Sequence, residues 1–247
     1  MLALSGPLFC TAQLASVAMQ PARTINDSLI DDSLTADNTD GSILCLTSSP
    51  RLDTSYSSLV AMRVLRELRQ VYPGATVTIR DLARNPLPHI DDDFVTATRS
   101  IAGPRTERQR AQVERSDDLI DELVSADVVV IAASMINFGI PSTLKAWFDH
   151  VVRPGRTFGY TGNGAQGLLR GRRAILVLAR GSIYSGGPLR PFEHDESYLR
   201  SVLEFIGITD VQTILIEGMA LGPEYAERAV DAAMRRAGAV AGVLAAA

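Results

Sequence analysis

The chain has 247 residues, of which 46% are hydrophobic and 21% charged, so it can fill the core of one α/β domain with additional segments. A formal net charge of −4 argues against nucleic acid as a main partner, because no excess of Lys and Arg exists to displace counterions. The two cysteines, Cys10 and Cys45, are too few and too poorly placed for a disulfide framework or a zinc site, which favours a reducing, cytoplasmic setting.

Residues 1–41 differ in composition from the rest of the chain. Met1–Gln20 is apolar and rich in small residues, whereas Pro21–Gly41 is polar and rich in Asp, Asn, Ser and Thr. A secretory signal is not favoured, because no Lys or Arg precedes Arg23. We therefore expect a disordered extension over residues 1–41 and a folded domain over residues 42–247. No other stretch reaches the roughly 18 apolar residues of a membrane span, so no membrane partner is expected.

The folded part opens with a short apolar run, Ile43–Thr47, that is typical of a buried strand. Apolar residues at helical spacing predict a helix over Ser55–Tyr72, which Pro73-Gly74 ends. Ala75–Ile79 alternates like a strand. Leu82–Phe94 contains two prolines and three consecutive aspartates and is interpreted as a loop. An amphipathic helix with a charged outer face follows over Thr106–Ser125.

The second half continues the alternation of strands and helices. Three further strands are predicted at Val128–Ala133, Ala174–Ala179 and Val211–Glu217. Three helices separate and follow them, at Ser142–Val152, Glu196–Ile206 and Pro223–Ala246. Five apolar strands alternating with helices predict an α/β fold, a doubly wound five-stranded parallel sheet with helices on both faces. Such sheets bind ligands beyond the carboxyl ends of their strands, so the chemistry is expected after the first, third and fourth strands.

The loop after the first strand is rich in hydroxyl groups and leads straight into a helix. It carries Ser48, Ser49, Ser55, Tyr56 and Ser57. N–H groups at a helix N-terminus and nearby hydroxyls suit a phosphate, although Ser and Thr also cap helices for structural reasons. The GxxxxGK[ST] pattern of triphosphate sites is absent, so the loop favours a single terminal phosphate, as on a mononucleotide.

The loop after the third strand, Ser134–Pro141, places apolar and aromatic side chains around one amide, Asn137. Such a wall suits a flat heteroaromatic ring. The alternative is a hydrophobic loop in which Met135 and Phe138 belong to the core.

The loop after the fourth strand, Ala179–Gly187, is rich in glycine, which lets the backbone approach a ligand closely. Either the Arg180 side chain or neighbouring N–H groups could face a developing negative charge.

One motif is misleading. Gly162–Gly167 fits GxGxxG, but neither a strand before it nor a helix after it is predicted, so it is interpreted as a surface loop. The histidines, His89, His150 and His194, lie in three separate segments without metal-ligand spacing. No metal site and no catalytic side chain is predicted.

Taken together, these loops resemble the FMN-dependent NADH-azoreductase family, also described as NADH:quinone oxidoreductases, which has a flavodoxin-like fold. The resemblance runs from about Ile43 to the C-terminus. It rests on Ser48-Ser49 with Ser55–Ser57, Ile131–Phe138, Leu144–Asp149, Thr157–Thr161, Gly167-Leu168, Ala179–Gly181 and Phe205–Asp210.

The resemblance implies a homodimer with one FMN per subunit near the interface, and NADH as the electron donor. The flavin phosphate would be held by Ser48, Ser55, Tyr56 and Ser57. The ring would be lined by Met135, Ile136, Asn137 and Phe138. Its pyrimidine edge would meet Ala179, Arg180, Gly181 and Ser182, and Tyr160 and Phe205 would help to enclose the substrate.

The implied activity is two-electron transfer from NADH to quinones and azo compounds in a ping-pong sequence. The alternatives are a flavodoxin-like electron carrier, an FMN reductase that releases its product, and a phosphate-binding hydrolase without flavin. The chain departs from the family pattern at Ser134, Ile136 and Ser182, where the family usually has Pro, Tyr and Gly. A backbone contact at Ser182 requires a negative φ there.

Overall fold

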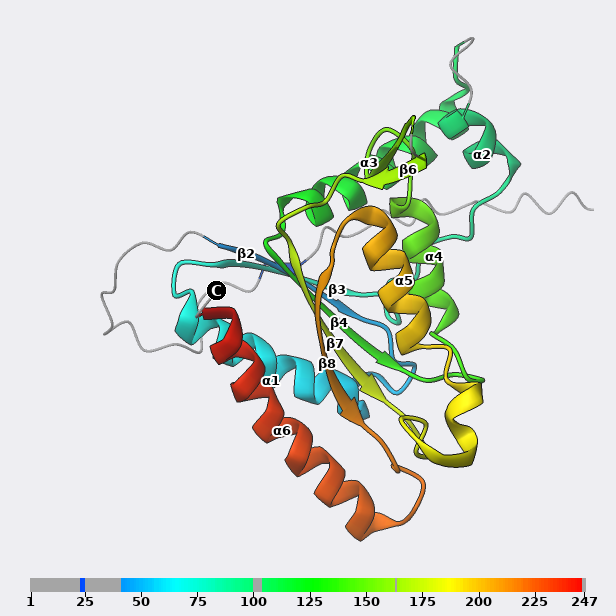
Figure 1. Cartoon of the computed structure of the whole chain (residues 1–247). Coiled ribbons are helices and arrows are strands. Elements are labelled where there is room, and N and C mark those ends of the chain that lie inside the picture. Colours follow the sequence, from blue (N-terminus) through cyan, green and yellow to red (C-terminus); the bar gives the residue numbers. More distant parts are fainter. Residues whose placement is uncertain (1–22, 25–40, 100–103, 163, 246–247) are drawn as a thin grey trace, which may run out of the picture.

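The computed structural model describes residues 23–24, 41–99, 104–162 and 164–245, and its core is one twisted sheet between two layers of helices (Figure 1). The order of the strands in the sheet is β1-β3-β2-β4-β7-β8. Their bounds are β1 Arg23–Thr24, β2 Ser42–Thr47, β3 Thr76–Asp81, β4 Val128–Ser134, β7 Arg173–Ala179 and β8 Asp210–Ile216. Strands β2, β3, β4, β7 and β8 are parallel, which confirms the predicted fold. The two residues of β1 pair antiparallel with β3 at the edge.

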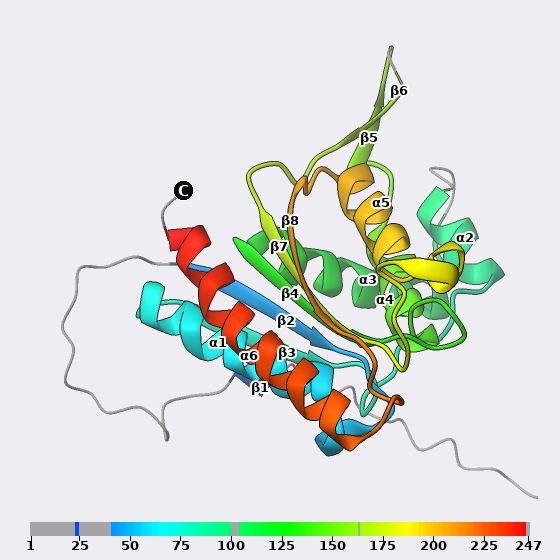
Figure 2. The ribbon, with the colours of Figure 1, turned by 60° about the horizontal axis from the view of Figure 1, so that its bottom comes forward.

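Both faces of the sheet are apolar, as a parallel sheet covered on two sides requires. Successive residues of β2 alternate between the faces, with Leu44 and Leu46 on one and Ile43 and Cys45 on the other. Helices α1 (Tyr56–Val71) and α6 (Pro223–Ala245) cover the Cys45 face (Figure 2).

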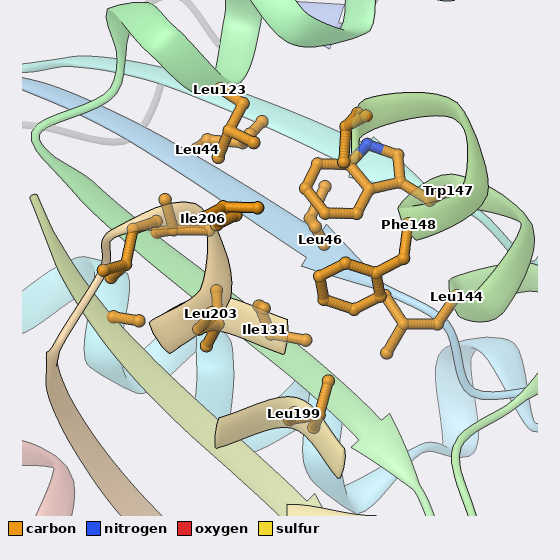
Figure 3. Close-up of a cluster of buried hydrophobic side chains, with 14 of the residues drawn as sticks. Leu44, Leu46, Leu123, Ile131, Leu144, Trp147, Phe148, Leu199, Leu203 and Ile206 are labelled. Atoms are coloured by element: carbon orange, nitrogen blue, oxygen red, sulfur yellow. The ribbon is translucent and has the colours of Figure 1, made fainter. Parts of the chain in front are cut away.

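Three helices cover the opposite face: α3 (Glu107–Ser125), α4 (Ser142–Val151) and α5 (Glu196–Ile206). Figure 3 shows their side chains packed on Leu44, Leu46 and Ile131 of the sheet. Trp147 and Phe148 of α4 form an edge-to-face pair in this cluster, with ring centroids 5.0 Å apart. Burial of this cluster and of its counterpart on the Cys45 face fixes the sheet, and so fixes the positions of the loops at its edges.

Helix α2 (Asp92–Arg99) contradicts the sequence interpretation. Part of the segment Leu82–Phe94, which the sequence predicts as a loop, belongs to this helix. Asp91 accepts a hydrogen bond from the Phe94 N–H, 3.0 Å away, as an N-cap does, and Asp92 and Asp93 occupy the first turn. The aspartates therefore start a helix instead of interrupting one, because negative charge is favourable at a helix N-terminus.

The GxGxxG segment forms part of a two-stranded hairpin, β5 (Phe158–Thr161) with β6 (Gly164–Gly167). The hairpin stands away from the sheet as an arm (Figure 2). The segment is therefore not the surface loop that the sequence predicts, and strand β5 precedes it. No helix follows it before β7, so the motif lacks the helix N-terminus that a dinucleotide cradle requires. The structure also contains a short 3₁₀ helix, Gly187–Phe192, that the sequence pattern does not predict.

The expected disordered extension over residues 1–41 lies outside the described residues, except for Arg23–Thr24 and Gly41. Within the part that is described, none of the helices is both long enough and apolar enough to cross a bilayer.

Candidate functional site

The sheet order places the three distinctive loops side by side. The chain leaves β2 toward β3 on one side, and β4, β7 and β8 then follow on the other, so the order reverses between β2 and β4. The register puts Thr47 opposite Ala132, and Ser134 opposite Ala179. The loops after β2, β4 and β7 therefore emerge together at the carboxyl edge of the sheet, where doubly wound folds bind their ligands.

The loop after β2 is held tightly against β4. The N–H and Oγ of Ser48 both donate to the Ala132 carbonyl, each over 3.1 Å. Leu52, in the 3₁₀ helix Leu52–Thr54, has a φ of 51°, an uncommon value for a side chain of this size. The Ser48 hydrogen bonds fix the start of the loop against β4.

The beginning of α1 presents an unusual concentration of donors. Ser55 caps the helix by accepting from the Ser58 N–H at 3.2 Å, and its Oγ lies 3.1 Å from that of Ser57. Both hydroxyls are buried. Among the described residues, none accepts a hydrogen bond from the N–H groups of Tyr56 and Ser57. Two free N–H groups, two buried hydroxyls and the positive end of the helix dipole suit an anion.

The loop after β4 is a tight turn under backbone strain. Ile136 and Gly139 exchange two N–H···O=C hydrogen bonds of 2.9 and 3.0 Å. The central residues, Asn137 and Phe138, have φ values of 47° and 74°, and type I′ turns require positive φ at both positions. A left-handed conformation at a phenylalanine costs about 1–3 kcal/mol, and such strain concentrates at ligand sites.

The turn is supported by the segment that follows β7. The Phe138 ring lies 5.2 Å from that of Phe192 and 6.3 Å from that of Tyr184, measured between centroids. The His194 N–H donates to the Phe138 carbonyl over 3.0 Å. Ile136 and Phe138 remain partly exposed. Together they form an apolar, aromatic wall beside the donors of α1, rather than part of the core.

The Arg180 side chain points into the protein and not toward the loops. Its guanidinium is fully buried, donates to both carboxylate oxygens of Asp195 at 2.8 and 3.1 Å, and donates to Glu217 at 2.9 Å. The sequence leaves open whether the Arg180 side chain or the neighbouring N–H groups face a negative charge. The structure shows that the side chain is occupied by Asp195 and Glu217. The Arg180 N–H is occupied as well, because it donates to the Ile216 carbonyl at 2.9 Å.

The backbone after β7 offers free donors. The carbonyls of Arg180, Gly181 and Ser182 accept from the N–H groups of Met219, Ala220 and Gly218 respectively. In the described part of the chain, nothing accepts from the N–H groups of Gly181 and Ser182. Ser182 is not among the residues with positive φ, so the condition for a backbone contact at this departure is met.

Excess negative charge surrounds Arg180. Glu193 and Glu196 place carboxylate oxygens 3.5 and 3.6 Å from the guanidinium, in addition to Asp195 and Glu217. Burial, followed by a hydrogen bond shared with Glu193, raises the pKa of Asp195 to about 6, although Arg180 opposes the shift. The hydrogen bonds and charges of these carboxylates outweigh the effect of burial on Arg180 and raise its pKa.

Two predicted site residues are not brought to this edge. Tyr160 lies on the β5–β6 arm and Phe205 near the end of α5, and both contact the ring of Phe158, at 5.6 and 4.7 Å between centroids. Helix α5 begins beside Arg180 and runs back to the amino edge, where β8 starts (Figure 1). The aromatic pair and the three loops therefore lie at opposite edges of the sheet in one chain.

Several residues that shape the site escape the sequence analysis. Glu217, Asp195, Tyr184 and Phe192 all support the loops after β4 and β7. Glu217 directly follows β8, so its place at the same sheet edge is the signal that the sequence offers.

Comparisons with known proteins agree with this geometry. A family model described as "Flavodoxin-like fold" matches residues 41–241. The chain is 50% identical over 195 residues to an FMN-dependent NADH:quinone oxidoreductase of Rhizobium johnstonii, covering 79% of this chain and 95% of that protein. It is 45% identical over 199 residues to FMN-dependent NADH:quinone oxidoreductase 2 of Pseudomonas fluorescens, covering 81% and 98%. The crystal structure of an FMN-dependent NADH-azoreductase from Bacillus anthracis in complex with FMN has a TM-score of 0.77 and 27% identity, covering 83% and 99%.

Proposed function

The chain belongs to the family of FMN-dependent NADH:quinone oxidoreductases with a flavodoxin-like fold, and we propose that it uses FMN to pass two electrons from NADH to quinones and azo compounds. The observation that carries the proposal is the convergence of three loops at the carboxyl edge. One offers anion donors, one an apolar wall and one free backbone N–H groups. These are the three surfaces that a phosphorylated flat ring requires.

The residues at the start of α1 fit the phosphate of FMN. Ser55 and Ser57 contribute buried hydroxyls, and the free N–H groups of Tyr56 and Ser57 complete the donor set. The Ser48 hydroxyl already donates to the Ala132 carbonyl, so Ser48 lines the site without donating. No Arg or Lys is needed, because the helix N-terminus supplies the favourable potential. We assign Ser48, Ser55, Tyr56 and Ser57 to the phosphate.

The wall and the free N–H groups fit the ring. We assign Met135, Ile136, Asn137 and Phe138 to its face, and the backbone of Ala179, Arg180, Gly181 and Ser182 to its pyrimidine edge. When bound, FMN supplies the two-electron chemistry itself. The chain orients the ring and directs the Gly181 and Ser182 N–H groups at the edge where negative charge develops. We assign no general acid to the protein, so protons come from solvent.

NADH and the acceptor use the same cleft in turn, which makes the kinetics ping-pong. The supporting observation is that the wall formed by Ile136 and Phe138 is partly exposed at the edge where the three loops converge. Initial rates should be measured against NADH at several fixed concentrations of benzoquinone. Parallel double-reciprocal lines are expected, and intersecting lines would contradict a shared cleft.

We further propose that the protein is a homodimer in which the arm of one chain completes the site of the other. Tyr160 is 76% exposed, and Phe205 and Leu168 are also exposed nearby, yet none of them can reach the loops of its own chain across the sheet. A second copy could bring them there as the substrate enclosure. A mass of one chain in sedimentation equilibrium would contradict this arrangement.

We place the protein in the cytoplasm. The two cysteines, Cys10 and Cys45, supply no disulfide framework, as is usual in a reducing compartment. Cys45 is fully buried, and burial raises the pKa of its thiol to about 12. Fractionation of cells that produce the full chain tests this location, and recovery outside the cytoplasm would contradict it.

A further inference from the structure

The loop after β7 is shaped by a single carboxylate. Glu217 Oε1 accepts from the N–H groups of Tyr184 and Ser185 at 2.8 and 2.9 Å, and its Oε2 accepts from the Ser185 hydroxyl. Three of the four donors that meet this carboxylate thus come from one loop. No helix or strand fixes residues 181–186, so the carboxylate takes the place of regular secondary structure there.

Glu217 is itself fixed from two directions. The buried Arg180 guanidinium donates to its Oε1 at 2.9 Å, and Arg180 is anchored in turn by Asp195. The chain then reverses at Gly218, which has a φ of 78°. A Cβ at that position would lie 2.4 Å from the Tyr225 ring, so the reversal accepts glycine alone. The carboxylate is therefore held by Arg180 and by the loop, on a backbone whose next residue must be glycine.

The free N–H groups that we assign to the flavin edge lie in this same segment. Gly181 and Ser182 directly precede the residues that Glu217 holds, and the Ser182 carbonyl accepts from the Gly218 N–H at 3.1 Å. The Gly181 and Ser182 N–H groups share their peptide planes with the Arg180 and Gly181 carbonyls, which accept from the Met219 and Ala220 N–H groups just after Glu217. The loop is therefore held on one side by the segment that follows Glu217 and on the other by the Glu217 carboxylate. We infer that Glu217 is a positioning residue, which acts through the loop to aim the Gly181 and Ser182 N–H groups at the pyrimidine edge of FMN. The inference rests on the proposed function.

Removing the carboxylate should weaken the binding of FMN. Glu217→Ala leaves the Tyr184 and Ser185 N–H groups without a partner, so the loop relaxes and the two free donors lose their alignment. We expect the dissociation constant of oxidised FMN to rise at least about tenfold, since alignment of charge-facing donors decides their strength. Amide hydrogen exchange should become faster at Tyr184 and Ser185.

Glu217→Gln separates geometry from charge. The amide oxygen can accept from the same backbone N–H groups, and its NH₂ group can donate to the Ser185 hydroxyl, so the loop keeps its shape while the charge is lost. Because both variants lose the charge, the difference between them reports the geometry alone. Reduced FMN carries more negative charge at this edge than oxidised FMN does. On going from Glu217→Gln to Glu217→Ala, the affinity for reduced FMN should therefore fall about tenfold more than the affinity for oxidised FMN. That factor corresponds to a two-electron midpoint potential about 30 mV lower.

Glu196→Gln is the matched control. It removes a carboxylate that lies 3.6 Å from Arg180 and contacts Arg200 and Thr213, but none of the loop N–H groups. Its FMN affinity and potential should stay near those of the wild type.

The experiment measures FMN affinity and midpoint potential for the wild type and the three variants. Wild-type protein that fails to bind FMN would refute the proposed function. Wild-type protein that binds FMN, with equal potentials in Glu217→Ala and Glu217→Gln, would overturn the positioning role alone. If Glu217→Ala does not fold, Glu217→Asp takes its place, because the shorter side chain withdraws the carboxylate from the Tyr184 and Ser185 N–H groups and keeps the charge. Faster exchange at Tyr184 together with weaker FMN binding would support the role, and wild-type FMN affinity and potential would overturn it.

Discussion

The carboxyl and amino edges of the sheet hold their projecting segments in different ways. At the carboxyl edge, three loops are fixed by buried polar groups and by strained backbone at Asn137 and Phe138, and they expose free donors. At the amino edge, the base of the β5–β6 arm is fixed by ion pairs. Arg153 donates to Ser116 and Asp117 at 2.7 and 2.9 Å, while Arg156 pairs with Asp117 and Asp121.

This contrast shows which edge can bind a ligand without a second chain. The loops carry donors held in place before any ligand arrives, which is what affinity requires. The arm carries exposed aromatic rings and donors that serve its own anchoring. Burial of such an apolar surface against another protein is favourable, whereas an apolar surface has no donors that could bind a small anion.

The largest effect is expected where the base of the arm is packed most closely. A Cβ at Gly167 would lie 2.2 Å from the backbone nitrogen of Gly207, so Gly167→Ala forces the arm and the end of α5 apart. We expect the free energy of unfolding to fall by at least about 3 kcal/mol in urea titrations. Gly159→Ala is the control in the same hairpin, because a Cβ added there would have no atom within 4 Å and its φ is not positive. Equal stabilities for the two variants would refute the close packing of the base.

A smaller effect is expected from the buried charge at the carboxyl edge. The pKa of Asp195 rises from 3.8 to about 6 on folding, so the folded protein binds the proton more tightly. This contribution to stability is present at low pH and is lost as the pH rises through about 6. Between about pH 4 and pH 6, the free energy of unfolding of the wild type should therefore fall by about 2 kcal/mol more than that of Asp195→Asn.

Asp53→Asn is the control for this pH dependence. Hydrogen bonding and charge attraction from Arg84 lower the pKa of Asp53, so its contribution is lost only below pH 3.8. Its stability profile between pH 4 and pH 6 should follow the wild type. If the stability of Asp195→Asn also follows that of the wild type between pH 4 and pH 6, Asp195 does not bind a proton in this range.

The smallest expected effect is on FMN affinity, when the buried hydroxyl of Ser57 at the carboxyl edge is removed; removal of the hydroxyl of its neighbour Ser58 is the control. Ser57→Ala removes a hydroxyl that we assign to the phosphate, and it should raise the dissociation constant of FMN about tenfold, or about 1.4 kcal/mol. Ser58→Ala changes a side chain for which the geometry shows no ligand role and should leave the constant unchanged. Fluorescence titration of the apoprotein measures both. Identical constants for the two variants would place the phosphate elsewhere.

The order of the strands and helices is predictable because burial on both faces leaves long apolar runs such as Val128–Ala133. Helix α2 is missed because aspartate favours loops and helix starts alike, and only the cap at Asp91 decides between them. The hairpin is missed because its strands are short and largely exposed, and so leave no apolar pattern.

The sequence predicts where the site residues lie along the fold, but not which way their side chains point. The sequence places Arg180 at the end of a strand, but only packing shows that its guanidinium turns inward to Asp195 and Glu217. Likewise, it cannot show that Tyr160 lies at the edge opposite the loops, because that depends on the direction in which α5 and the arm leave the sheet.

The most direct test of the central assignment is an anaerobic titration. FMN-reconstituted protein is titrated with NADH while the visible absorbance of the flavin is followed, and benzoquinone is then added. We expect complete bleaching without a one-electron intermediate, followed by full recovery with quinone. Failure to bind FMN, or a flavin band that NADH leaves unchanged, would contradict the assignment of this chain as an NADH:quinone oxidoreductase.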